Sequence, residues 1–277
     1  MPDWEILLKR AKKDVLCAVE AWSSVLEETF GSRLEYAYAK GSALKKWCSL
    51  IDYVPIISDV DIHIMLNDDK PLFQPSRRGF ATSIEVSKKY EMKFYELRGE
   101  YLHIPRSQVI HINPNLDNPS FILPQISEVH VMAGCPKDGT IPSKDRIRKN
   151  DSNQIWGLAE YLDDLPRQTF DRVGFDFWTL LRRMCWRVSP SPVRLITQEH
   201  PDPLEVWEWN RTTIVEELRK RNLNSIANSY QKYYETGWQL FFSNFSGSIE
   251  IRDVVIHGYS VLQGCLEQLS STRPLPD

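Results

Sequence analysis

The chain has 277 residues, of which 42% are hydrophobic and 26% charged, a balance typical of a globular protein with one large or two modest domains. Its net charge of -3 and sequence pI near 6.1 exclude the basic excess that a dedicated nucleic-acid-binding protein uses to neutralise phosphates. Five scattered cysteines without zinc spacing, and no run of about 20 apolar residues, predict a cytoplasmic protein with free thiols and without a membrane span.

The first part of the chain predicts an α/β (α+β) domain with a small mixed sheet over residues 1–145. We expect Asp3 to cap a helix whose apolar residues recur at helical spacing until near Gly31. A short helix is expected over 42–48 and a charged helix over 88–97. Strands are expected at about 34–40, 58–66, 107–113 and 127–132.

The pattern changes after Gly139, because apolar residues then recur at spacings of three and four without further strand signals. This predicts an all-α helical bundle over 146–277, with helices at 152–164, 167–187, 203–222, 224–243 and 249–269. Six of the nine tryptophans lie here, and we expect them to form the bundle core: Trp156, Trp178, Trp186, Trp207, Trp209 and Trp238.

The feature that points most directly to function is a Gly-Ser turn between the strand ending near Lys40 and the short helix expected to follow. Gly41 allows the backbone to approach an anion closely, and a helix N-terminus beginning at Ser42 offers unpaired N–H groups and a hydroxyl. A triphosphate would fit there, and Lys45 could reach it. Taken alone, the same turn is an ordinary helix N-cap, and Lys45 an ordinary surface lysine.

The second feature is the alternation of carboxylates along the next strand. Asp59, Asp61, His63 and Met65 point to one face, and the intervening apolar residues point to the other, which is expected to be core. Two carboxylates one pleat apart repel each other unless a cation lies between them, and Mg²⁺ with phosphate is the usual solution. We expect His63 to be packed or hydrogen-bonded beside the site. A solvated edge strand is the structural alternative.

The arrangement of a hydrophobic residue, Gly41 and Ser42, followed by Asp59 and Asp61, resembles the DNA polymerase β-like nucleotidyltransferase superfamily, and the helical second half resembles its small kanamycin-type members. The resemblance implies transfer of a nucleoside monophosphate from an NTP, for which we expect ATP, to a hydroxyl of a small molecule or protein. Gly41 and Ser42 would then bind phosphate, and Asp59 and Asp61 would bind Mg²⁺.

Two departures accompany the resemblance. The segment between Ser42 and Asp59 is longer than in most members, which an inserted loop over 51–57 explains. The family also commonly has a third carboxylate on the next core strand, where this chain has Gln108 and His111. Glu128, in the following strand, is the substitute metal ligand that we predict.

Two alternatives remain open. Arg252, His257 and Tyr259 match the spacing of HEPN-domain ribonucleases, which cleave RNA without metal and would need a homodimer; a buried histidine and a surface arginine are the structural alternative. The missing third carboxylate would also suit a catalytically degenerate nucleotide-binding protein. The sequence does not choose a catalytic base among Asp176, Glu205, Glu208 and Glu216.

Overall fold

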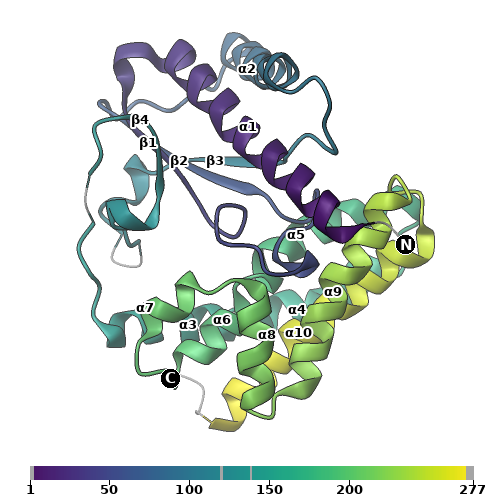
Figure 1. Cartoon of the computed structure of the whole chain (residues 1–277). Helices are drawn as coiled ribbons and strands as arrows, with labels where there is room; N and C mark the ends of the chain where they lie inside the picture. The colour runs from purple at the N-terminus through teal and green to yellow at the C-terminus, as the bar shows by residue number, and fades with distance from the viewer. Residues whose placement is uncertain (1–2, 119–120, 138, 273–277) are drawn as a thin grey trace. The chain divides into compact units, whose positions relative to one another are not determined.

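A computed structural model describes residues 3–118, 121–137 and 139–272 (Figure 1). The chain divides into two compact units. Unit 1 comprises residues 1–44 and 59–141, and unit 2 comprises 45–58 and 142–277. The segment 45–58 therefore groups with the helical second half, although the sequence suggested a single boundary near residue 145.

The first helix of unit 1 confirms its sequence prediction. Helix α1 spans Trp4–Phe30, and the Asp3 carboxylate caps it by accepting hydrogen bonds from the backbone N–H groups of Glu5 and Ile6. The helix ends at Gly31, whose φ of 50° is disfavoured for other residues. The second helix, α2 (Arg77–Leu97), packs beside α1 and begins well before the predicted residue 88.

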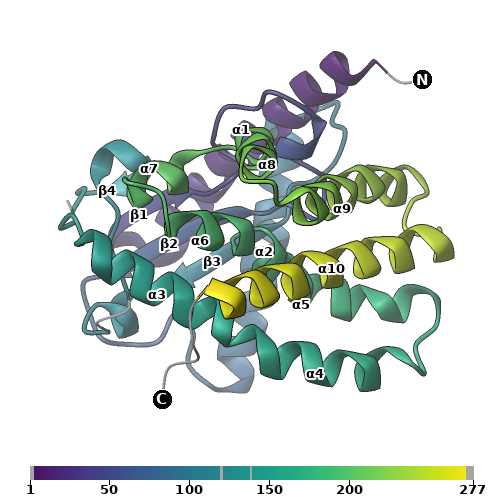
Figure 2. The ribbon, with the colours of Figure 1, turned by 90° about the horizontal axis from the view of Figure 1, so that it is seen from below.

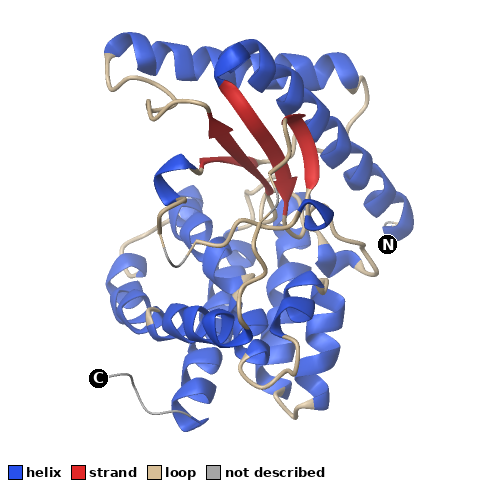
Figure 3. Ribbon diagram, turned by 90° about the vertical axis from the view of Figure 1, so that its left-hand side faces the viewer, coloured by secondary structure: helices blue, strands red, loops and turns tan. Residues whose placement is uncertain are grey.

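Unit 1 contains a four-stranded mixed sheet with the strand order β3-β2-β1-β4. Its strands are the red arrows of Figure 3. Strand β1 pairs antiparallel with both β2 and β4, whereas β2 and β3 run parallel. The last strand begins later than the predicted residue 127. The strands are β1 (Leu34–Lys40), β2 (Val60–Leu66), β3 (Ser107–His111) and β4 (His130–Gly134).

Both faces of the sheet carry apolar side chains. Ala37, Ala39, Ile62 and Ile64 are fully buried on one face. The opposite face, on which the sequence predicted Asp59, Asp61, His63 and Met65, is also apolar over much of its length. There, Tyr36, Tyr38, Met65 and Ile112 form a buried cluster, which Phe121 and Leu123 of the following loop help to cover. Asp61 lies at the end of this face where β2 begins, opposite Lys40.

Unit 2 is helical throughout its described elements, apart from short turns (Figure 2). Three predicted helices are interrupted. The predicted helix 152–164 is broken at Gly157, where one helix ends and the next begins. The predicted helix 167–187 is interrupted by residues 170–176, and 203–222 is interrupted where Asn210 caps a new helix by accepting from the N–H of Thr213. The helices are α3 (Lys144–Trp156), α4 (Leu158–Thr169), α5 (Phe177–Val188), α6 (Ser191–Thr197), α7 (Pro203–Glu208), α8 (Arg211–Lys220), α9 (Asn224–Phe242) and α10 (Ser248–Thr272).

The prediction of a tryptophan core is also wrong, because only Trp238 of the six is fully buried and Trp186 is 48% exposed. The largest buried side chains of α9 are instead Trp238 and three tyrosines, Tyr230, Tyr233 and Tyr234. Tyrosine suits this position because its ring packs like an apolar group while its hydroxyl can reach a backbone acceptor. Tyr230, for example, donates to the carbonyl of Ser189.

Arg211 fixes the segment 45–58 within unit 2. Its buried guanidinium donates from Nη1 to the carbonyls of Ile51 and Asp52 at 3.0 and 3.1 Å and to Ser58 Oγ at 2.9 Å. The same group lies 4.0 Å from the centre of the Tyr234 ring, a cation–π contact. One side chain therefore satisfies the polar groups of a loop whose apolar residues are buried in the helical core.

Two expectations from composition can be compared with the described residues. The five cysteines form no disulfide, as predicted. Among the helices that the structure describes, none combines the length and apolar character needed to cross a membrane.

We predict that Arg211→Met lowers the free energy of unfolding by about 3 kcal/mol or more, because two carbonyls and one hydroxyl lose their buried donor. Urea denaturation followed by tryptophan fluorescence measures this. Arg219→Met is the control, because the Arg219 guanidinium donates to Gln231 at the surface. The control should change stability by less than about 0.5 kcal/mol. Equal stability of the two variants would contradict the role of Arg211.

Candidate functional site

The end of β1 and the start of β2 bring the Gly-Ser turn beside the carboxylate strand. Because the two strands are antiparallel, Lys40 lies directly opposite Asp61. Gly41 follows with a φ of 93°, and a Cβ atom added to it would lie 2.5 Å from Asp61 Oδ2. A side chain at position 41 would thus collide with the carboxylate. The structure brings Gly41 and Asp61 together, as the sequence predicted.

The short helix predicted over 42–48 is wrong. Only a single turn follows Gly41, closed by a hydrogen bond from the N–H of Leu44 to the carbonyl of Gly41. Lys12 of α1 holds this turn by donating to the carbonyl of Ala43 at 3.0 Å, and partial burial lowers the pKa of Lys12. An anion at Ser42 would therefore meet the backbone of a turn, without the dipole of a helix.

Asp59 lies just before β2 and is paired with a cation. Arg106 Nη2 is 3.1 Å from Asp59 Oδ2, and the side chains of the two residues are only 11% and 17% exposed. The backbone reinforces the pair, since the N–H of Val60 donates to the carbonyl of Arg106 at 2.9 Å. Arg106 was not among the residues predicted from the sequence. The sequence feature that could have indicated it is its position directly before the strand that was expected to carry the third carboxylate.

The third carboxylate is not found among the residues described. In the parallel register of β2 and β3, the neighbour of Asp61 is Gln108. Glu128 lies in the short turn 126–128 before β4, where Oε2 accepts from the backbone N–H of Gln125 at 2.9 Å. Strand β1 separates β4 from β2. Within residues 3–118, 121–137 and 139–272, no three His, Cys, Asp or Glu side chains are grouped to hold a metal. Glu128 therefore does not complete a cluster with Asp59 and Asp61.

His63 is packed within the sheet, as expected. Its Nδ1 is 2.9 Å from the hydroxyl of Tyr38 on the neighbouring strand. Burial, with a smaller effect of Lys40, lowers the pKa of His63 to about 3. Burial also raises the pKa of Tyr38. Both side chains are therefore uncharged at neutral pH, and this pair contributes structure to the sheet beneath Asp61.

Lys45 belongs to unit 2. Its ammonium group donates to the carbonyls of Trp207 and Trp209 at the end of α7, a favourable place for a cation. Contact between Lys45 and phosphate stays a prediction.

The ribonuclease motif on α10 is spread around the helix. Arg252 and His257 are five residues apart, about 140° around a helix of 3.6 residues per turn. The Arg252 guanidinium donates to the carbonyl of Ser248 and lies 4.7 Å from the centre of the Phe177 ring. Burial lowers the pKa of His257. The helix does not direct the two side chains to one point.

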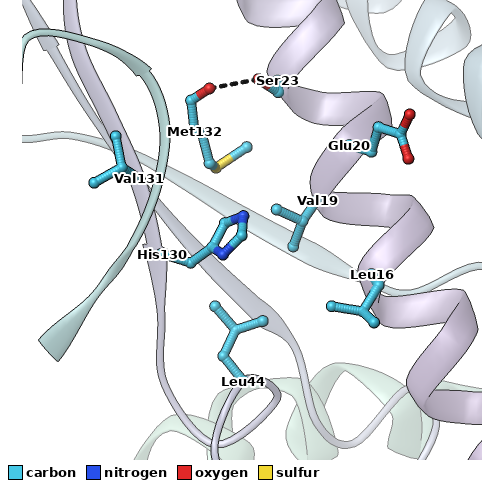
Figure 4. A pocket seen from close by; sticks show the side chains of 8 residues that line it. All are labelled: Leu16, Val19, Glu20, Ser23, Leu44, His130, Val131 and Met132. Carbon is cyan, nitrogen blue, oxygen red and sulfur yellow. Dashed lines mark hydrogen bonds between the residues drawn. The ribbon is translucent and has the colours of Figure 1, made fainter. Parts of the chain in front are cut away.

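A pocket of about 320 Å³ lies between α1 and β4 and reaches the turn after Gly41 (Figure 4). Ser23 closes one end by donating to the carbonyl of Met132 at 2.7 Å. The pocket is near the lower end of the size range for small-ligand sites. Its lining is mostly apolar and consists of Leu16, Val19, Glu20, Ser23, Leu44, His130, Val131 and Met132.

Comparison of the chain with protein-family models, with curated proteins and with solved structures found no match.

We predict that Gly41→Ala displaces the carboxylate of Asp61, whereas Gly31→Ala does not. Both glycines have positive φ, so each substitution carries a conformational cost of about 1–2 kcal/mol. A Cβ at Gly31 meets nothing within 4 Å, however. The ¹³C resonance of the Asp61 carboxyl carbon should therefore shift only in Gly41→Ala. An unchanged resonance in that variant would contradict the close packing of Gly41 and Asp61.

We also predict that His63 makes the fold sensitive to acid. In the unfolded chain its pKa is about 6.5, and in the folded chain it is about 3. Between these values the unfolded state holds more protons, so stability falls as the pH is lowered. His63→Gln should reduce the slope of stability against pH by up to about 1.4 kcal/mol per pH unit. Denaturant unfolding at a series of pH values measures the slope. Tyr38→Phe, which keeps the buried histidine, should retain it.

Proposed function

We propose that this chain is a nucleotidyltransferase, which transfers a nucleoside monophosphate from an NTP to a hydroxyl group. The proposal depends on the position of the Asp61 carboxylate, which lies where a side chain at position 41 would be. Phosphate at the turn and a cation at the carboxylate would be held side by side there. The mixed sheet supports it, since its antiparallel β1–β2 pair is what joins the turn to the carboxylates.

The carboxylates fit Mg²⁺, which prefers oxygen ligands and is commonly held by one or two carboxylates together with substrate phosphates. Asp59 and Asp61 supply that number, and the remaining positions would be filled by phosphate and water. Bound there, Mg²⁺ would neutralise negative charge that develops on the phosphates. Without a third protein ligand among the described residues, binding of the ion should depend on the nucleotide.

In the proposed reaction, the acceptor hydroxyl oxygen forms a bond to the α-phosphorus of the NTP. The bond from this phosphorus to the bridging oxygen of the β-phosphate breaks, pyrophosphate leaves, and the hydroxyl proton passes to a base or water. In this scheme, the turn at Gly41 and Ser42 would orient the phosphates. Asp59 and Asp61 would hold Mg²⁺ beside them. We propose ATP as the donor and a small molecule or a protein side chain as the acceptor.

The test is transfer of α-³²P label from each NTP, with Mg²⁺, into the small-molecule, protein and RNA fractions of a cell extract. Asp59→Asn and Asp61→Asn should each lower the transfer by about 100-fold or more, since the ion supplies several kcal/mol. Asp68→Asn is the matched control, because Asp68 follows the same strand at its other end and pairs with Arg33 at 2.8 Å. It should retain activity.

Label in one fraction only with the native protein would identify the acceptor class. The proposal would be wrong if no fraction were labelled. Nucleotide binding without transfer would then indicate a degenerate nucleotide-binding protein. RNA cleavage that is sensitive to His257→Ala would indicate the ribonuclease.

A further inference from the structure

Each carboxylate of the candidate site has a cationic neighbour: one cation lies on strand β1, and the other directly precedes strand β3. Arg106 lies 3.1 Å from Asp59, and Lys40 is the partner of Asp61 in the β1–β2 register. Directly opposed residues on neighbouring strands share a face, where opposite charges attract. Two carboxylates at one site are stabilised by a balancing positive charge, and the protein itself provides part of it.

Arg106 is the more firmly fixed of the two cations. Arginine carries its charge on a planar group with fixed donor directions, and the Arg106 side chain is only 11% exposed. The hydrogen bond from the N–H of Val60 to its carbonyl extends the β2–β3 ladder by one residue and sets its position beside Asp59. A charge pair shielded from water in this way interacts more strongly than one at the surface.

The neighbouring position on β3 adds no negative charge, because Gln108 is the partner of Asp61. The site therefore has two carboxylates, one buried guanidinium beside the first, and a neutral amide beside the second. Such a site can balance one divalent ion brought in with phosphate. A second divalent ion would have to occupy a place where Arg106 already supplies positive charge.

We propose that Arg106 is a fixed cation of the nucleotide site and replaces a second divalent ion, so that the nucleotide complex holds a single Mg²⁺. This inference rests on the proposed function for the presence of nucleotide. Arg106 is a positioning residue in this scheme, since it acts through Asp59. Two changes together should allow the site to bind a second divalent ion. One removes the guanidinium of Arg106, and the other places a carboxylate at position 108, in register with Asp61.

The test is titration with Mn²⁺, followed by electron paramagnetic resonance, of the protein alone and with the non-cleavable analogue α,β-methylene-ATP. The native complex should bind one Mn²⁺ per chain. The double variant Arg106→Gln/Gln108→Glu should bind two. In the absence of nucleotide, the double variant should bind Mn²⁺ about tenfold or more tightly than the native protein does. A positive charge that repels the ion has been removed, and a carboxylate has been added. Two ions in the native complex, or no gain in the double variant, would overturn the inference.

Arg98→Gln is the matched control, because it removes an arginine that is paired with Asp14 at 2.9 Å elsewhere in unit 1. It should leave the stoichiometry at one. Circular dichroism checks that the variants fold. If the double variant does not fold, Arg106→Lys is measured instead. Because this variant keeps the positive charge, its nucleotide complex should still hold one ion, and a second ion would overturn the inference. A native protein that binds no nucleotide would contradict the proposed function. The nucleotide-free titration would still test the role of Arg106.

Discussion

The register between β1 and β2 is the constraint on which the candidate site depends. Because Lys40 lies opposite Asp61, the residue after the strand, Gly41, lies against the carboxylate, and a Cβ atom there would displace it. A slip of one residue would turn Asp61 and His63 to the other face, among the buried alanines and isoleucines of the sheet. Burial of Tyr38 and His63 opposes such a slip, because their hydrogen bond forms only in this register. The buried side chains of β1 and β2 and the hydrogen bond between Tyr38 and His63 therefore stabilise the same β1–β2 register.

Sequence patterns predicted well those elements whose signals are local. Asp3 and Gly31 delimit α1 because a capping carboxylate and a positive φ act within a few residues. Strand β1 was likewise predicted from an apolar run that ends at Ala39, and β2 from the alternation that includes Asp61. The helix expected after Ser42 failed for a non-local reason, since residues from Lys45 onward are drawn into contacts of unit 2. The helix break at Asn210 did have a local signal, because asparagine is a common N-cap residue. The spacing of apolar residues, from which one continuous helix was predicted, does not show it.

The charges of the site could be predicted only in part. Asp59 and Asp61 stand out in the sequence, but their countercharges come from Lys40 and Arg106, which lie on other strands or at their ends. Pairing across a sheet depends on strand order, and neither the parallel partnership of β2 and β3 nor its register can be read from one sequence. Glu128 illustrates the same limit. Its place near a strand suggested a ligand, whereas its carboxylate caps the turn in which it lies.

The route of the chain between the two motifs explains why so long a segment separates them. The chain leaves unit 1 after Leu44 and re-enters it at Asp59, so residues 45–58 join the Gly-Ser turn to the carboxylates through unit 2. Arg211 fixes Ile51, Asp52 and Ser58, and the Trp238 indole donates to the carbonyl of Leu50. Both ends of the segment are thus covalently continuous with the site, while its middle is buried in the other unit. Loss of Arg211 would release Ile51, Asp52 and Ser58, and Ser58 directly precedes Asp59 in the chain. The contacts of Arg211 therefore bear on the candidate site through the peptide bond between Ser58 and Asp59.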